Sequence, residues 1–350
     1  GYGGPLIADD GIYVNAEEDG KSYTVCLDHK GSFRWRSPNG KAFMGMDFSA
    51  SYPGTRSIPA VQGAFVYAIS GLGHISCFKR QSGEVIWSVD LVKNFQGKPG
   101  DFGYSESPVM DGKNMYCFTG GSVHNIVALD LHTGELSWSS PVKRDSFAYS
   151  TPILLDLPGR KVLVGTSRNF IHVVDCSDGT LLSTYRLEDI KYGWEHCNSV
   201  VHQDGYIYFV AAEEQGQGSV KLQLSADGTS LKEIWRNPKV VNVFEGFVVH
   251  GNWLYTTLEN KKLVCVDTET GRIRHSLRAE SGNLVCADNK LIIYGHSGKL
   301  QFFALKDGIP EPRSEMRVRD GSGQHFSYPV ISGSVMYIRR GDALMAYALQ

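Results

Sequence analysis

One segment of sequence returns eight times along this chain, and this repetition constrains the fold more than any other feature. The repeats are recognised by a short apolar stretch, and they begin at Pro5, Pro59, Pro108, Pro152, Val200, Phe247, Asn283 and Pro329. A period of roughly 46 residues is too short for an independent domain and is the size of one supersecondary unit in a repeat protein. We therefore expect similar units that bury apolar surface against their neighbours.

Each repeat reads as a series of short strands. A two-residue turn follows the opening stretch, as in Asp10-Gly11 and Asp204-Gly205, where we expect the glycine to supply a positive φ angle. The next strand carries a tyrosine in most repeats, for example Tyr67, and the apolar residues alternate with period two. The pattern predicts a single all-β domain over residues 1–350, an eight-bladed β-propeller of four-stranded antiparallel blades. Seven blades are the alternative, if the degenerate seventh repeat is not a full sheet.

The second half of the repeat carries a motif that resembles the tryptophan-docking motif of the quinoprotein-type β-propellers, which have PQQ-like repeats. It is clearest in Ala128-x-Asp130-x-x-Thr133-Gly134-x-x-x-Trp138, with His275 and Ser183 at the Trp position of two other copies. In that family each outer-strand Trp docks on a small residue of a neighbouring blade. The resemblance implies a structural role for the tryptophans of this motif, Trp35, Trp87, Trp138 and Trp235.

The eighth repeat reaches Gln350 directly after its third expected strand. In the resembled family the N-terminus usually supplies the missing outer strand, since an unpaired edge would otherwise remain at the seam of the ring. We expect either a further N-terminal segment or a three-stranded last blade. Residues 306–315, which contain Pro310 and Pro312, are predicted to form a flexible surface excursion.

Composition excludes several classes of protein. The formal net charge is -2 and no run is rich in Lys or Arg, so the sequence lacks the electrostatic signature of nucleic-acid binding. No apolar run approaches the length that crosses a bilayer. The seven cysteines show no metal-binding spacing and are interpreted as buried apolar residues. We expect a monomer without a transmembrane segment.

Binding residues are expected in the links that enter the first strand of each repeat, because in a propeller these links gather around one mouth of the central channel. They could form a pocket for a polar ligand such as a sugar or a quinone, although each Tyr could instead pack between blades. The candidate ligand-binding residues are Tyr2, Arg56, Tyr104, Glu106, Tyr149, Trp194, Glu195, His196, Glu245, His325 and Tyr328.

The resemblance implies one enzymatic hypothesis, that the protein is a dehydrogenase that uses pyrroloquinoline quinone (PQQ) with calcium. Such enzymes hold the quinone between a Trp and a vicinal Cys-Cys disulfide, and no Cys-Cys or C-x-x-C-H occurs here. Glu106, Glu195, Glu245 and Asn198 do not match the family's calcium ligands residue by residue.

A glycan-active enzyme with a Glu195-His196 pair is a further alternative. Adjacent residues of a strand point to opposite faces, which disfavours this pair unless the link is a turn.

The preferred hypothesis is a non-catalytic propeller that binds a partner protein or a polar ligand at these links. It resembles the envelope propeller lipoproteins that assist outer-membrane barrel assembly, and it assumes no catalytic residue, metal or cofactor. The resemblance implies the periplasm or cell envelope of a Gram-negative bacterium.

Overall fold

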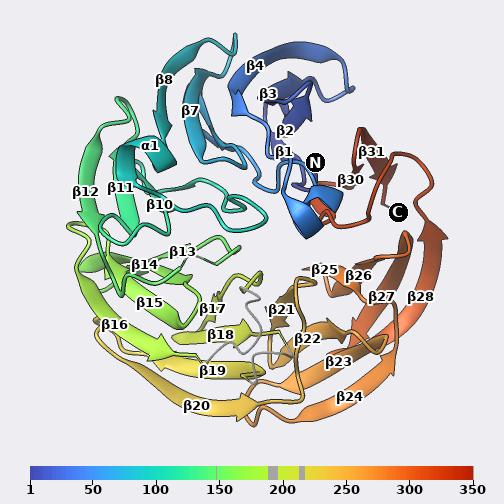
Figure 1. Ribbon diagram of the computed structural model, residues 1–350. Coiled ribbons are helices and arrows are strands. Elements are labelled where there is room, and N and C mark those ends of the chain that lie inside the picture. Colours follow the sequence, from blue (N-terminus) through green and yellow to red (C-terminus); the bar gives the residue numbers. More distant parts are fainter. Residues whose placement is uncertain (147, 188–195, 213–216, 350) are drawn as a thin grey trace. The chain divides into compact units, whose positions relative to one another are not determined.

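The computed structural model describes residues 1–146, 148–187, 196–212 and 217–349, and the regular secondary structure of these residues is almost entirely β-strand (Figure 1). The exceptions are the 3-10 helix η1 (Asp47–Ser51) and the short helix α1 (Leu91–Phe95). Within the described part, the strands form eight antiparallel sheets, and each sheet uses strands that are consecutive in the sequence. We call these sheets blades 1 to 8 in chain order.

The first four blades take up the chain as far as Arg186. Blade 1 contains β1 (Leu6–Ala8), β2 (Gly11–Glu18), β3 (Lys21–Leu27) and β4 (Phe33–Lys41). Blade 2 contains β5 (Ala60–Gln62), β6 (Phe65–Ile69), β7 (His74–Lys79) and β8 (Val85–Asp90). Blade 3 contains β9 (Val109–Met110), β10 (Asn114–Phe118), β11 (Ile126–Asp130) and β12 (Leu136–Ser140). Blade 4 contains β13 (Ile153–Leu157), β14 (Arg160–Thr166), β15 (Phe170–Asp175) and β16 (Leu181–Arg186).

The last four blades follow in the same way. Blade 5 contains β17 (Val201–Gln203), β18 (Tyr206–Val210), β19 (Ser219–Leu224) and β20 (Leu231–Asn237). Blade 6 contains β21 (Phe247–His250), β22 (Trp253–Leu258), β23 (Lys262–Asp267) and β24 (Ile273–Arg278). Blade 7 contains β25 (Gly282–Ala287), β26 (Lys290–Gly295), β27 (Lys299–Lys306) and β28 (Ile309–Arg317). Blade 8 contains β29 (Val330–Ser332), β30 (Val335–Arg340) and β31 (Ala343–Ala348).

This succession of sheets is that of an eight-bladed β-propeller, and the predicted fold class is confirmed. The seven-blade alternative is wrong, because the degenerate seventh repeat forms the complete sheet β25 to β28. Blade 8 has three strands in the described residues, as one of the two expectations for it required.

The chain divides into two compact units. Unit 1 comprises residues 1–156, 160–163 and 174–181, and unit 2 comprises residues 157–159, 164–173 and 182–350.

The hairpin turns between first and second strands use the predicted residues, with one difference. Asp204 and Gly205 both have positive φ angles, 51° and 79°, as a two-residue hairpin turn requires. Gly11 is not among the residues with positive φ. A Cβ atom on Gly11 would lie 2.4 Å from the carbonyl oxygen of Leu27, so this glycine is required by the close approach of β3 instead.

The outer-strand tryptophans lie at joints between successive blades. The indole Nε1 of Trp35 donates to the carbonyl oxygen of Arg80 at 3.0 Å, and its ring covers Gly83 in the following turn. Cys26, the small residue of the motif, is the cross-strand partner of Trp35 within blade 1. The joint thus combines a buried ring, a hydrogen bond and a turn glycine without a side chain. The same contacts recur for Trp87 with Leu131 and Gly134, Trp138 with Cys176 and Gly179, and Trp235 with Thr268 and Gly271.

At two joints inside unit 2 the outer strand carries another residue in place of the motif tryptophan. Ser183 of β16 donates its hydroxyl to the carbonyl oxygen of Gly228 at 2.9 Å, which connects blade 4 to blade 5. Between blades 6 and 7 the ring of Trp253 lies against Gly308, and His275 packs on Trp253 with ring centroids 5.7 Å apart. In each case a side chain of one blade therefore contacts the turn glycine of the next blade, Gly228 or Gly308, although the contacting side chain differs.

The prediction of a flexible surface segment at residues 306–315 is wrong, because β28 (Ile309–Arg317) pairs with β27 along this segment. Pro310 and Pro312 are compatible with this strand because it is the outer strand of blade 7, where one side needs no ladder bonds. All seven cysteines are free thiols, five of them buried and two, Cys197 and Cys286, partly exposed.

Candidate functional site

The link before blade 2 holds Arg56 against aromatic rings in unit 1. The guanidinium carbon lies 5.2 Å from the ring centroid of Tyr2, 5.4 Å from that of Phe43 and 5.5 Å from that of Phe102. Its two terminal nitrogens donate to the carbonyl oxygens of Gly54 and Tyr52 at 2.9 and 2.8 Å. These contacts order the link, since a cation on a ring face and two carbonyl acceptors restrain a long side chain.

Tyr149 belongs to the same assembly. Its hydroxyl accepts a hydrogen bond from the backbone N–H of Phe102 at 3.1 Å, and the two rings meet edge to face with centroids 5.8 Å apart. Phe102 thus contacts both Arg56 and Tyr149, and Arg56 also lies on the ring of Tyr2. Phe102 was not a predicted site residue, because an isolated aromatic in a Gly-rich link carries no period-two signal.

Tyr104 and Glu106 are buried in unit 1, with exposed fractions of 1% and 2%. The Tyr104 hydroxyl donates to the carbonyl oxygen of Thr119 at 2.8 Å. The Glu106 carboxylate accepts from the backbone N–H of Phe118 at 3.1 Å, and burial raises the pKa of this carboxyl well above its ordinary value. Both side chains are held by the strand β10 region of their own blade.

Glu106 occupies a position that the repeat uses for a backbone contact. Two residues before the expected start of a blade, a polar side chain bonds to the backbone of the residue twelve positions later. Ser57 donates to the carbonyl oxygen of Ile69 at 2.5 Å, and Asn198 donates to that of Val210 at 2.8 Å. Ser327 likewise donates to the carbonyl oxygen of Arg339. The position therefore anchors the link to the second strand, and Glu106 does the same through an N–H group.

The predicted residues of unit 2 are also held by internal contacts. His196 is buried and packs edge to face on Phe209, with ring centroids 5.0 Å apart. Glu245 is 3% exposed, accepts from the backbone N–H groups of Val243 and Phe244 at 3.1 Å, and has a pKa raised by burial. Trp194 and Glu195 lie outside the described residues, and with them the proposed Glu195-His196 pair.

His325 and Tyr328 belong to the link before blade 8. His325 is 9% exposed, and its Nδ1 contacts the hydroxyl of Tyr294. Burial, followed by the positive charges of Arg340 and Arg317, lowers the pKa of His325 to about 4, so its ring is neutral at pH 7. Tyr328 is 39% exposed, and its hydroxyl lies so close to Gly246 that a Cβ atom there would be 2.1 Å away.

The described residues do not fit the calcium site of a quinoprotein. No group of three or more His, Cys, Asp or Glu side chains among them could hold a metal ion. The side-chain amide of Asn198 donates hydrogen bonds to the carbonyl oxygen of Val210 and, at 2.6 Å, to the side-chain oxygen of Asn242. The carboxylates of Glu106 and Glu245 accept hydrogen bonds from backbone N–H groups.

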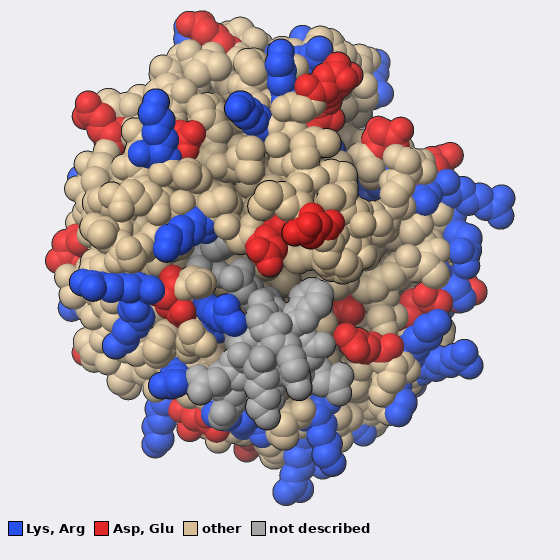
Figure 2. Space-filling view, viewed as in Figure 1, with Lys and Arg blue, Asp and Glu red and all other residues tan. Residues whose placement is uncertain are grey.

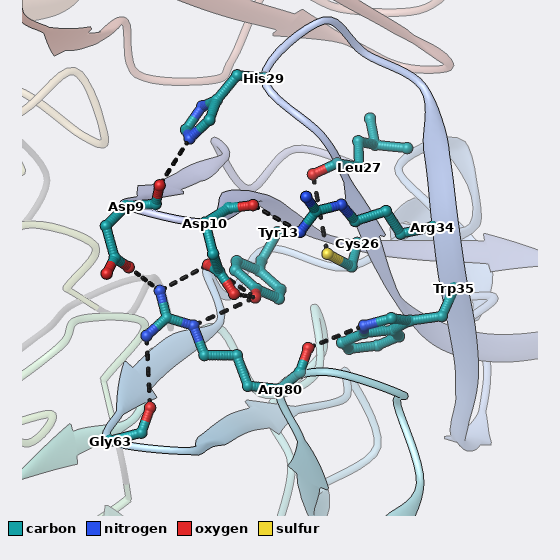
Figure 3. A network of polar contacts seen from close by, with 10 residues as sticks. All are labelled: Asp9, Asp10, Tyr13, Cys26, Leu27, His29, Arg34, Trp35, Gly63 and Arg80. Carbon is teal, nitrogen blue, oxygen red and sulfur yellow. Dashed lines mark hydrogen bonds and ion pairs between the residues drawn. The ribbon is translucent and has the colours of Figure 1, made fainter.

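A second polar cluster, formed by turns of blades 1 and 2, joins these two blades (Figure 3). The guanidinium of Arg80 pairs with the carboxylates of Asp9 and Asp10, and its Nε lies 3.4 Å from the hydroxyl of Tyr13. It also donates to the carbonyl oxygen of Gly63 at 3.4 Å. Burial opposes ionisation of Asp10, but the bonds from Arg80 and Tyr13 outweigh it and lower the pKa of this carboxyl. Arg80 thus ties its own turn to the Asp9-Asp10 turn of blade 1 and to the Gly63 turn of blade 2, and we call this cluster the clamp.

Sequence reasoning also missed an exposed apolar segment between blades 1 and 2. Met44, Met46 and Phe48 are 59%, 81% and 61% exposed. The signal was present, since the run Met-Gly-Met-Asp-Phe is rich in large apolar residues for a polar link.

Charged side chains of both signs are interspersed on the face shown in Figure 2, which contains no large area of a single sign. In the described residues no helix is both long and apolar enough to cross a bilayer.

These features define a class of protein, the eight-bladed β-propellers with PQQ-like repeats. A solved structure of this class, BamB from Moraxella catarrhalis, superimposes with a TM-score of 0.70 at 14% identity and covers 98% of this chain and 92% of that chain. A quinohemoprotein alcohol dehydrogenase, ADHIIG from Pseudomonas putida HK5, superimposes with a TM-score of 0.56 at 16% identity, over 86% of this chain and 62% of that chain. At these identities the likeness shows the fold alone.

The family follows from the sequence. The family model described as outer membrane protein assembly factor BamB matches residues 20–277 and 216–338, and the chain belongs to this family. A curated relative, the outer membrane protein assembly factor BamB of Yersinia pestis, is 27% identical over 132 residues. That match covers 37% of this chain and 32% of the relative, so the chain spans about a third of the curated relative it matches.

Proposed function

We propose that this protein is a non-catalytic scaffold of the bacterial cell envelope, which binds a partner protein during outer-membrane protein assembly. The observation that supports it most directly is the family match over residues 20–277 and 216–338. We further propose that the protein acts in the periplasm, as a monomer and without a cofactor.

The state of the ionisable link residues supports a role in binding rather than catalysis. A general acid or base must reach the proton it transfers, yet Glu106 and Glu245 are 2% and 3% exposed and accept backbone N–H groups. His325 is 9% exposed and contacts Tyr294. These residues stiffen the links, and a stiff link presents its exposed side chains in one arrangement at little entropic cost.

Two measurements test this proposal. In host cells that lack the protein, we expect lower amounts of folded outer-membrane barrel proteins, restored by the wild-type chain. Tagged wild-type protein, cross-linked in cells and purified, should carry a component of the barrel-assembly machinery. Normal barrel levels together with no assembly component in the purified material would overturn the proposal.

A third measurement tests the enzyme alternative. Purified protein titrated with PQQ and Ca²⁺ should show no saturable spectral change. A saturable change, with reduction of an artificial electron acceptor by added alcohol, would establish the dehydrogenase reading instead.

A further inference from the structure

The link between β4 and β5 presents a compact apolar surface in unit 1. Met44, Met46 and Phe48 fall within five consecutive residues and are more than half exposed. Single exposed apolar side chains are ordinary on protein surfaces, whereas three within five residues concentrate exposed apolar surface in one link. We call Met44, Met46 and Phe48 the link patch.

The link patch rests on an ordered base. Met46 precedes η1 (Asp47–Ser51), and its backbone N–H donates to the hydroxyl of Ser49 at 2.9 Å. The ring of Phe48 packs on Tyr52 with centroids 5.4 Å apart and on Phe102 with centroids 6.2 Å apart. Because the base is packed, a ligand would meet the patch without first having to order the link.

Two exposed carboxylates border this base. Asp47 lies between Met46 and Phe48, and Asp101 directly precedes Phe102. The guanidinium of Arg56, which belongs to the same link, is engaged by ring faces and by the carbonyl oxygens of Gly54 and Tyr52. Lys98 is also exposed, three residues before Asp101. The exposed charges directly adjacent in sequence to Phe48 and Phe102 are thus both negative, and the charge of Arg56 is held against the rings and the two carbonyl oxygens.

We propose that the link patch binds a polypeptide segment that carries apolar side chains next to a Lys or Arg. The apolar side chains would cover Met44, Met46 and Phe48, and the cation would meet Asp47 or Asp101. This inference rests on the proposed function and adds to it the binding surface and the chemistry of the partner segment. Methionine suits such a surface, since its flexible thioether adapts to differently shaped apolar partners.

The same charges disfavour other occupants. A membrane surface rich in anionic lipid would repel Asp47 and Asp101. A second copy that paired through this patch about a twofold axis would bring Asp47 toward Asp47, which is a repulsive contact. A basic, apolar segment satisfies both the exposed rings and the carboxylates.

The test places a photoreactive amino acid, p-benzoylphenylalanine, at position 46 of the full chain in host cells. The control carries it at Phe33 of β4, which is 64% exposed and lies outside the link. After irradiation, the cross-linked peptides are sequenced by mass spectrometry. We expect position 46 to react with one polypeptide segment that has apolar residues beside Lys or Arg, at a yield several-fold above that of position 33.

A charge variant completes the test. Asp47 has a φ angle of 50°, which Asn tolerates, so Asp47→Asn with Asp101→Asn removes both charges with little strain. We expect this double variant to lower the yield at position 46 about three- to tenfold and to weaken its dependence on salt. Glu135→Gln, a neutralised carboxylate in an exposed turn of blade 3, should leave the yield unchanged.

The outcomes separate the two proposals. Lipid adducts, adducts with a second copy, an acidic or polar segment, a yield no higher than at position 33, or no effect of the double variant would each overturn the link patch as this binding surface. If the wild type still carries an assembly component, the proposed function stands after such a result. If barrel levels are normal and no component is recovered, the proposed function itself falls.

Discussion

The indole Nε1 of Trp87 donates a hydrogen bond to the carbonyl oxygen of Leu131 over 2.9 Å, which ties the outer strand of blade 2 to the turn of blade 3. The hydroxyl of Tyr67 donates to the same oxygen at 3.2 Å. A carbonyl oxygen has two lone pairs, and this joint uses both. Trp138 donates in the same way to the carbonyl oxygen of Cys176, whereas the hydroxyl of Tyr116, 3.4 Å from that oxygen, donates its shorter bond to the carboxylate of Asp111.

Removing one donor of this joint should destabilise the fold measurably. Trp87→Phe keeps an aromatic ring but loses the N–H group and part of the buried area, so we expect the free energy of unfolding in urea to fall by about 1–3 kcal/mol. Tyr67→Phe should cost about 1 kcal/mol. The double variant should cost more than the sum, because the buried oxygen then has no donor. Phe33→Leu on the exposed face of β4 is the control, and a Trp87→Phe protein as stable as this control would contradict the prediction.

The turn glycines under the tryptophans should tolerate no side chain. Gly134 has a φ angle of 72°, and a Cβ atom on it would lie 2.6 Å from Cε3 of Trp87. Gly205 has a φ angle of 79°, with nothing within 4 Å of its Cβ position. Alanine at either site meets the same backbone strain, about 1 kcal/mol, but only Gly134→Ala also displaces an indole, for a further 1–3 kcal/mol. Equal losses in thermal unfolding would show that the ring contact contributes nothing.

The clamp in Figure 3 should depend on the shape of the Arg80 side chain as well as on its charge. Arg80→Lys retains the charge but cannot reach Asp10, Tyr13 and Gly63 together, so we expect a loss of about 1 kcal/mol. Asp9→Asn should change the free energy of unfolding by less than about 0.5 kcal/mol, since the Asp9 side chain is 85% exposed. Urea unfolding at low and high salt would check the order, and a greater loss for Asp9→Asn than for Arg80→Lys would refute it.

The repeat could be predicted from sequence because its signals are local. Strand and turn geometry within a few residues sets the sequence spacing between Gly134 and Trp138. It also sets the residues of the turn before each second strand. The chemistry of the links could not be predicted in this way. Whether Arg56 projects into a channel or lies on Tyr2 and Phe102 depends on residues brought from other links by the fold.

One usable signal in the links was overlooked. Aligned on the blade starts, Ser57, Glu106, Asn198 and Ser327 occupy one position, and such recurrence of polar residues indicates a structural bond more than a ligand. The alignment of the repeat would have marked Glu106 as an anchor of its link. The same alignment would not have revealed the exposure of Met46, since no other repeat has an equivalent segment with which to align it.

His325 gives the fold a defined dependence on pH. Burial, then the charges of Arg340 and Arg317, lower its pKa to about 4, whereas an unfolded histidine titrates near 6.5. As the pH falls from about 6.5 to about 4, the unfolded chain therefore gains a proton that the folded protein does not. The contribution of His325 to stability is fully present above this window and is lost within it, by up to about 1.4 kcal/mol per pH unit.

The buried carboxyls oppose this trend, because a raised pKa lets folded Glu106 and Glu245 take up protons before the unfolded chain does. The wild-type curve alone is therefore a sum of both effects, and the variant His325→Gln is needed to separate them. Glutamine retains an acceptor for the hydroxyl of Tyr294 but does not titrate. Urea unfolding between pH 7 and pH 4 should show that the wild type loses up to about 3 kcal/mol more than His325→Gln. Parallel curves for wild type and His325→Gln would mean that the folded protein accepts the proton on His325 as readily as the unfolded chain.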